Sequence, residues 1–146
     1  LAERDPDAHV WPDNVAARAQ ARAVSAEMHG GVGPLRRECG MNLHRPVRAK
    51  ALSVEAQADI ARVQQIWTDC RKRHGSLGPY LFGRFSAADA MYAPVVHRFR
   101  TYAIEVSPVV RDYMEVMLMH PAVAEWTREG LAETLVIERF EIDEVA

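Results

Sequence analysis

The stretch FGRFSAADAMYAPVV, residues 82–96, decides the fold of this chain. Ser86 and Asp89 have the spacing of a capping box, in which each side chain accepts a hydrogen bond from the other residue's backbone N–H. Phe85, directly before them, can pack on the first helical turn as a hydrophobic staple. We therefore expect a helix from residue 86 to about residue 103. Its first half is apolar nearly all round, which is typical of a helix at the centre of a bundle.

Pro94 lies inside this expected helix. Proline has no N–H to donate to the carbonyl of Ala90, and its ring crowds the same carbonyl. We expect a bend between residues 90 and 94. The bend would aim the second half of the helix, which carries Arg98 and Tyr102, toward a cleft.

The preceding part of the chain has helical rather than strand-like periodicity. A first helix is expected after Pro12, with Asp13 as its N-cap, and the glycine-rich segment 30–33 bends or divides it. A second helix over residues 53–74 has Ser53 as its N-cap and carries an apolar stripe. The stripe consists of Val54, Ile60, Val63, Ile66, Trp67 and Cys70.

Two shorter helices complete the expected fold. They cover residues 108–119 and 121–133, each with a proline at the first helical position, which suits a helix N-terminus. The predicted fold class is all-α, with about five helices around a buried central helix. We divide the chain into residues 1–12, which form the end of a helix and a linker, a helical domain over residues 13–133, and an acidic tail over residues 134–146.

The composition argues against several classes of function. The chain has 146 residues, of which 49% are apolar and 26% charged, as in one ordinary globular domain. Its net charge of −2 gives no field that would attract nucleic acid or anionic lipid, and its apolar runs are too short to span a bilayer. The histidines show no metal-site spacing, and the two distant cysteines favour reduced thiols in the cytoplasm. We expect no nucleic-acid, membrane or metal binding.

Gly83, Ser86, Ala88 and Asp89 form the pattern G-x-x-S-x-A-D. This pattern resembles the signature of the C-terminal helical domain of cytosolic glutathione transferases, where it caps the buried central helix. The stretches ARAQARAVSAEMHGG, DIARVQQIWTDCRKR and HPAVAEWTREGLAE resemble further helices of the same domain, the last with its P-x-x-x-x-W pattern. LAER followed by VWP resembles the end of the family's thioredoxin-like domain and the linker after it. The resemblance covers nearly the whole chain and is closest to bacterial members.

The resemblance implies that the chain is part of a longer enzyme. The thioredoxin-like domain of the family holds the glutathione site and the catalytic Ser, Tyr or Cys, so no residue of this chain is assigned a catalytic role and the chain alone is expected to be inactive. Glutathione is implied as a co-substrate rather than a tightly bound cofactor, with a small hydrophobic electrophile as its partner. The parent is expected to transfer glutathione to the electrophile or to reduce it, and to form a homodimer through the first two helices.

The resemblance also implies a set of binding residues. In bacterial relatives the stretch like AEMHGG faces the cleft with its histidine near the glutathione sulfur, so His29 is the first candidate. The further candidates are Arg22 and Glu27 near glutathione, Ser25, Met28 and Val32 in the pocket wall, and Arg98 and Tyr102 at the electrophile pocket.

Plainer interpretations of these residues stay open. His29 can simply decorate the end of a helix, Met28 and Val32 can belong to the core or an interface, and arginine is rarely buried unless paired. The capping role explains Asp89 fully, so we do not expect it to be catalytic. Two other functions also stay open. One is a helical protein-interaction module without catalysis, as in some translation or stress proteins of this family, and the other is a structural bundle that dimerises.

Overall fold

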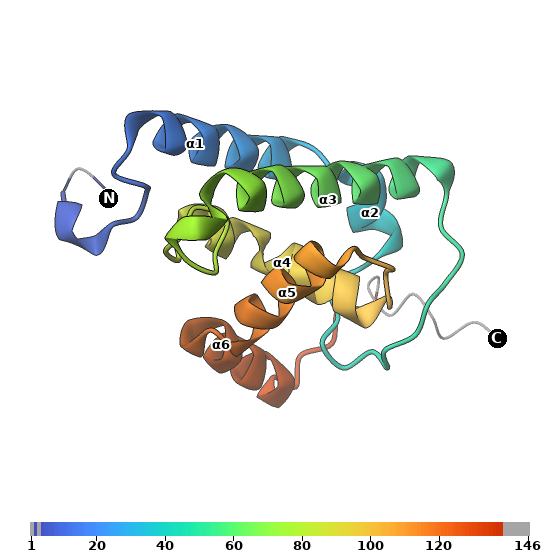
Figure 1. The fold of residues 1–146 in the computed structure, drawn as a ribbon. Coiled ribbons are helices and arrows are strands. Elements are labelled where there is room, and N and C mark those ends of the chain that lie inside the picture. Colours follow the sequence, from blue (N-terminus) through green and yellow to red (C-terminus); the bar gives the residue numbers. More distant parts are fainter. Residues whose placement is uncertain (1, 3, 139–146) are drawn as a thin grey trace.

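The computed structural model describes residue 2 and residues 4–138, which fold into a helical bundle (Figure 1). Within this part of the chain there is no β-strand beyond isolated bridges in the loop 80–84, so the predicted all-α class is confirmed. The first expected helix is divided in two, so residues 4–138 contain six α-helices. They are α1 (Val15–Gly30), α2 (Gly33–Glu38), α3 (Val54–His74), α4 (Ala87–Thr101), α5 (Pro108–Met119) and α6 (Pro121–Ala132), with short 3-10 helices at Pro6–Ala8 and Gly75–Leu77.

The helix starts follow the expected capping chemistry with one exception. Ser53 caps α3 as expected, because its hydroxyl accepts a hydrogen bond from the Ala56 N–H at 3.1 Å. The prediction that Asp13 caps α1 is wrong. Asn14 is the N-cap, and its side-chain oxygen accepts from the Ala17 N–H at 3.0 Å, whereas the Asp13 carboxylate faces His9 at 3.3 Å.

The helix α4 is the centre of the bundle. It packs against α1 on one side and against α5 on the other, while α5 also contacts α3 and α6 (Figure 1). Nine of its fifteen residues are buried, which agrees with the expected central position. The chain continues as one helix through Pro94, and the expected bend there stays a prediction.

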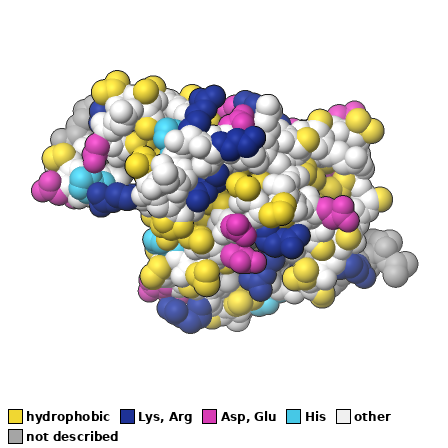
Figure 2. All heavy atoms as spheres, viewed as in Figure 1, with side chains coloured by type: hydrophobic (Ala, Val, Ile, Leu, Met, Phe, Trp, Pro, Cys, Tyr) yellow, Lys and Arg dark blue, Asp and Glu magenta, His cyan; other side chains and the backbone are white. Residues whose placement is uncertain are grey.

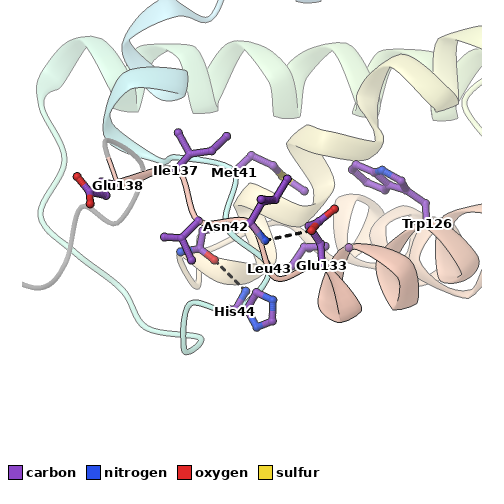
Figure 3. A pocket seen from close by; sticks show the side chains of 11 residues that line it. Met41, Asn42, Leu43, His44, Trp126, Glu133, Ile137 and Glu138 are labelled. Carbon is purple, nitrogen blue, oxygen red and sulfur yellow. Dashed lines mark hydrogen bonds between the residues drawn. The ribbon is translucent and has the colours of Figure 1, made fainter.

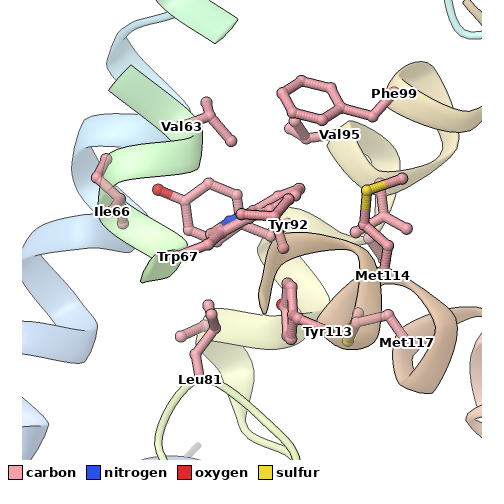
Figure 4. Close-up of a cluster of buried hydrophobic side chains, with 14 of the residues drawn as sticks. Val63, Ile66, Trp67, Leu81, Tyr92, Val95, Phe99, Tyr113, Met114 and Met117 are labelled. Atoms are coloured by element: carbon pink, nitrogen blue, oxygen red, sulfur yellow. The ribbon is translucent and has the colours of Figure 1, made fainter. Parts of the chain in front are cut away.

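An aromatic cluster joins α3, α4 and α5 (Figure 4). The ring of Trp67 lies 5.5 Å from Tyr92, 5.2 Å from Phe99 and 5.1 Å from Tyr113, between ring centroids, and its side chain is fully buried. Tilted and edge-to-face contacts of this kind stabilise a core beyond the area that they bury. The prediction that Val54 belongs to the buried stripe of α3 is wrong. Val54 is 79% exposed, because it lies in the first turn of α3, before the helix reaches the core.

The start of α4 is held by the predicted capping box. The Asp89 carboxylate is fully buried and accepts from the Ser86 N–H at 2.9 Å and from the Ser86 hydroxyl at 3.0 Å. It also accepts from the Leu81 N–H at 3.0 Å and from the Tyr113 hydroxyl at 3.2 Å. One carboxylate therefore joins the loop before α4, the start of α4 and the middle of α5. The expected staple of Phe85 on the first turn stays a prediction, and the Phe85 ring stacks on His120, 3.8 Å between centroids.

Gly83, the first residue of the G-x-x-S-x-A-D pattern, has a backbone conformation that other residues rarely adopt. Its φ is +90°, and a Cβ there would lie 2.6 Å from the Cβ of Leu77. Only glycine fits such a turn without strain. The tight loop that Gly83 permits carries Leu81 to the Asp89 carboxylate.

Candidate functional site

The corner between α1 and α2 contains Met28, His29 and Val32, three of the binding residues predicted from the sequence. At this corner the Arg36 guanidinium of α2 donates hydrogen bonds to three carbonyls that end α1. They belong to Met28, to His29 at 2.8 Å and to Gly31 at 2.6 Å. The last carbonyls of a helix have no partner within the helix, and Arg36 supplies one. The negative end of the helix dipole also lies there, so the Arg36 cation is stabilised at this position. Arg36 therefore fixes the end of α1, although no sequence motif indicates this role.

Val32 makes the turn between the two helices with a left-handed backbone. Its φ is +51° and its ψ is +37°, and it is the N-cap of α2. A β-branched residue pays about 1–2 kcal/mol for this conformation, so surrounding contacts must hold it. One such contact is the Leu35 N–H, which donates to the Asp59 carboxylate of α3 at 3.0 Å. Backbone strain of this kind gathers at functional sites, which makes the corner a candidate.

The polar candidates on α1 lie on its outer side. His29 is exposed at the end of the helix. Glu27 forms a bidentate ion pair with Arg62 of α3, with Nε to Oε1 at 2.6 Å and Nη2 to Oε2 at 2.9 Å. These hydrogen bonds from Arg62 lower the pKa of Glu27. The Arg22 guanidinium lies 5.7 Å from the ring centroid of Trp11 in the linker.

The wall candidates on α1 face inward. Ser25 is buried, and its hydroxyl donates to the Ala21 carbonyl at 2.8 Å. Met28 is half-buried and packs against the hydrophobic core. The Ser25 hydroxyl therefore contacts only the backbone of α1, whereas Met28 and Val32 lie at the corner between α1 and α2.

Arg98 of α4 and Tyr102, the C-cap residue of this helix, contact the loop 39–50. The Arg98 Nε donates to the Cys39 carbonyl at 2.8 Å, and its Nη1 donates to the Pro94 carbonyl at 3.2 Å. Burial lowers the pKa of Arg98, and the nearby Arg36 acts in the same sense. The Tyr102 ring is 1% exposed and lies under the Arg45 guanidinium, 4.1 Å from its centroid. The structure thus gives both residues contacts within the chain.

Six of the nominated residues do not form one open pocket. Met28, His29, Val32 and Arg98 gather around α2, while Arg22 and Glu27 contact Trp11 and Arg62 elsewhere on α1. The roles that the resemblance implies for these residues stay predictions.

A large hollow lies elsewhere, between the loop after α2 and the helix α6 (Figure 3). Its volume is about 810 Å³, and it lies between the loop after α2, the helix α6 and the segment after α6. None of the binding residues nominated from sequence is among its lining residues within the described ranges. We call it the tail pocket, and its lining residues are Met41, Asn42, Leu43, His44, Trp126, Gly130, Glu133, Leu135, Val136, Ile137 and Glu138. Trp126, in the P-x-x-x-x-W pattern, is the signal that points to it in the sequence.

Neither cysteine can supply a thiolate at neutral pH. Burial raises the pKa of the Cys39 thiol to about 11 and that of the Cys70 thiol to about 12. The thiolate is the nucleophilic form, so both residues are inert core thiols. Among residues 4–138 there is also no group of three histidine, cysteine, aspartate or glutamate side chains placed to hold a metal ion.

The face of the described residues that Figure 2 shows carries charges of both signs. On the face seen in Figure 2, basic and acidic side chains alternate, and hydrophobic side chains lie between them. A search of the described helices found none that is both long and apolar enough to cross a membrane.

The chain matches a known protein family. A family described as glutathione S-transferase, C-terminal domain, matches residues 18–129. The matched range runs from α1 into α6 and includes the capping box and the corner around α2. A search among curated proteins found no match. The resemblance read from the sequence is thus confirmed at the level of the family, and its bacterial character stays a prediction.

Proposed function

Because this chain belongs to the family of glutathione S-transferase C-terminal domains, we propose that it is the helical half of a glutathione transferase. The parent enzyme transfers glutathione to a small apolar electrophile or reduces it. The family match over residues 18–129 carries this proposal. The raised pKa values of Cys39 and Cys70 agree with this proposal, because the reacting thiol of a glutathione transferase belongs to glutathione and not to the protein.

In this proposal the two domains divide the chemistry. A thiol with a pKa of about 8.5 needs hydrogen-bond donors or positive charge beside it to form a thiolate at neutral pH. We assign that activation to a thioredoxin-like domain of the parent, and we assign binding to the corner around α2. His29 is exposed there at the end of α1, and Arg36 fixes the backbone that carries it. Met28 and Val32 supply the apolar contact beside it.

The remaining candidates take supporting roles. Arg22 and Glu27 lie on the outer side of α1, where a second subunit could bring them near glutathione in a homodimer formed through α1 and α3. Ser25, Arg98 and Tyr102 support the corner from within, because their polar groups or rings already have partners in the chain. We expect the parent in the cytoplasm, where thiols stay reduced.

We place the contact with the thioredoxin-like domain at an apolar hollow of about 330 Å³. It lies between α4 and α6, and Trp126 on its edge is 41% exposed. Apolar patches on a domain surface mark contact sites. Its lining residues are Phe85, Ala90, Ala93, Pro94, Ala122, Val123 and Trp126.

A conjugation assay on the parent enzyme tests the proposal. The parent should form a thioether from glutathione and an activated aryl halide, and the 146-residue chain alone should not. The variant His29→Ala should lower kcat/KM of the parent about tenfold or more, as expected for a positioned polar group near the reacting sulfur. His44→Ala, which removes an exposed histidine from the loop after α2, is the matched control. A parent that neither conjugates nor binds glutathione would favour the interaction-module alternative.

A further inference from the structure

We propose that the tail pocket binds an apolar molecule that carries a primary ammonium group. This inference does not depend on glutathione chemistry. It rests on the size of the pocket, its apolar walls, the sign of the charge in its lining, and the local hydrogen bonds within each of its two sides.

The size and the walls of the tail pocket suit a small ligand. Its volume of about 810 Å³ lies within the range of roughly 300–1,000 Å³ that is usual for ligand sites. Apolar side chains form most of the wall, and several are exposed: Leu135 by 81%, Val136 by 69% and Ile137 by 55%. A ligand that removes these side chains from water gains their hydrophobic burial. Figure 3 shows Trp126 at one end of the pocket and Ile137 toward the other.

The charge of the lining selects a cation. The charged lining residues are Glu133 and Glu138, and no lysine or arginine is among the described lining residues. Arg45 follows directly after His44, but its Nη1 donates to the carbonyls of Pro46, Arg48 and Thr101, all outside the lining. An anionic ligand would therefore meet two carboxylates. An ammonium group gains from both of them.

Trp126 adds a second preference for a cation. Its side chain is 41% exposed, and its ring lies edge-to-face against His97, 5.3 Å between centroids. An exposed indole face attracts an ammonium group through the ring quadrupole. The apolar part of the same ligand can pack on the ring as well.

Local hydrogen bonds hold both sides of the pocket. The Glu133 carboxylate accepts from the Thr134 N–H at 2.8 Å and from the Leu135 N–H at 3.0 Å, which sets the direction of the segment after α6. On the other side, the Asn42 side-chain oxygen accepts from the His44 N–H at 2.9 Å and from the Arg45 N–H at 3.2 Å. A site whose walls are already ordered loses less entropy when a ligand binds.

Gly130 lets the two sides approach each other. A Cβ at this position of α6 would lie 2.7 Å from the Cδ1 atom of Leu43. Because Gly130 and Leu43 both line the pocket, a larger side chain at residue 130 must displace Leu43 and reshape the pocket wall. This gives a direct way to block the pocket without changing its charge.

The test compares three probes that share one apolar body. Titration calorimetry on the 146-residue chain uses 1-naphthylmethylammonium, 1-naphthylmethanol and 1-naphthylacetate. We expect saturable one-site binding of the ammonium probe, about five- to tenfold tighter than the alcohol and tighter still than the carboxylate. Raising the salt concentration should narrow the difference between the ammonium probe and the alcohol, since salt screens exposed charges.

Variants then place the probe in the tail pocket. The double variant Glu133→Gln, Glu138→Gln should bring the ammonium probe to the affinity of the alcohol. The double variant Glu125→Gln, Glu129→Gln, which makes an equal charge change on the exposed side of α6 outside the pocket, should not. Gly130→Leu should abolish binding. Ala122→Leu adds the same side chain to α6 in the neighbouring apolar hollow and should leave binding intact. Far-UV circular dichroism confirms that each variant is folded.

Three results would overturn the proposal. They are the absence of saturable binding of the ammonium probe, equal or tighter binding of the carboxylate probe, and binding that survives Gly130→Leu but is lost in Ala122→Leu. The last result would move the site to the hollow between α4 and α6.

Discussion

The Tyr113 hydroxyl of α5 donates a hydrogen bond to the Asp89 carboxylate of α4, 3.2 Å away, in a part of the core where both side chains are at most 1% exposed. Burial raises the pKa of the Asp89 carboxyl, whereas its hydrogen bonds to Leu81, Ser86 and Tyr113 lower it. A helix cap is usually a local device. Here the capping carboxylate is also the contact that joins two helices and a loop.

Replacing Asp89 should therefore cost more than an ordinary cap. Asp89→Ala leaves several buried donors without an acceptor, so we expect a loss of about 3 kcal/mol or more in the free energy of unfolding, against about 1 kcal/mol for a typical cap. Tyr113→Phe removes one donor and should cost about 1 kcal/mol. Urea denaturation measures both. An unchanged midpoint in Asp89→Ala would show that the carboxylate does not hold the fold.

Gly83 gives a second test of the same region. Gly83→Ala places a Cβ 2.6 Å from the Leu77 Cβ at a φ of +90°, so we expect a loss of about 2 kcal/mol. Gly30→Ala is the matched control, because a Cβ there has no atom within 4 Å and the residue ends α1. The control should be neutral or slightly stabilising. Equal thermal midpoints for the two variants would contradict the strained turn.

His97 should make stability depend on pH. Its side chain is 2% exposed, its Nε2 lies 3.1 Å from the Thr127 hydroxyl of α6, and Trp126 covers its ring. Burial lowers the pKa of His97, and Arg100 adds to this. The folded state thus favours neutral His97, so its contribution is complete above a pH of about 6.5 and is lost as pH falls through the folded pKa.

The measurement is the urea midpoint between about pH 5 and pH 7.5. His97→Gln should flatten the fall in stability on the acid side, while His44→Gln, an exposed histidine, should leave it as it is. A smaller fall should persist in His97→Gln, because burial also lowers the pKa of His74. A wild-type midpoint that stays constant over this range would rule out the buried neutral state of His97.

Arg36 should control the order of the α1 C-terminus. Arg36→Met removes the donor that serves the carbonyls of Met28, His29 and Gly31, so the last turn of α1 should exchange its amide hydrogens about tenfold faster. The Gly31 N–H, which donates to the Glu27 carbonyl at 2.8 Å, is the reporter. Arg37→Met, on the exposed side of α2, is the control. Unchanged exchange at Gly31 would show that Arg36 does not secure the corner.

Local sequence signals predicted the helices and the capping box because these depend on neighbouring residues. Proline starts, the Ser53 cap and the Ser86–Asp89 spacing each act within one turn. The prediction of Asp13 as the N-cap of α1 failed because the next residue, Asn14, is an equally good cap and accepts the hydrogen bond from the Ala17 N–H.

The sites were harder to predict because they depend on contacts between distant segments. The tail pocket brings residues 41–44 against residues 133–138, and no periodicity in either segment indicates this. Arg98 and Tyr102 share the face of α4 that was expected at a cleft, yet the loop 39–50 folds onto that face and engages both. The role of Arg36 could not be predicted from sequence, because its three acceptors are backbone carbonyls, which every residue has.

A calorimetric titration of glutathione tests most directly whether this chain is the helical half of a glutathione transferase. Glutathione is titrated into the parent enzyme and, in parallel, into the 146-residue chain. We predict saturable binding by the parent, weakened in His29→Ala and unchanged in His44→Ala, with no measurable binding by the chain alone. A parent that shows no glutathione binding would contradict the account.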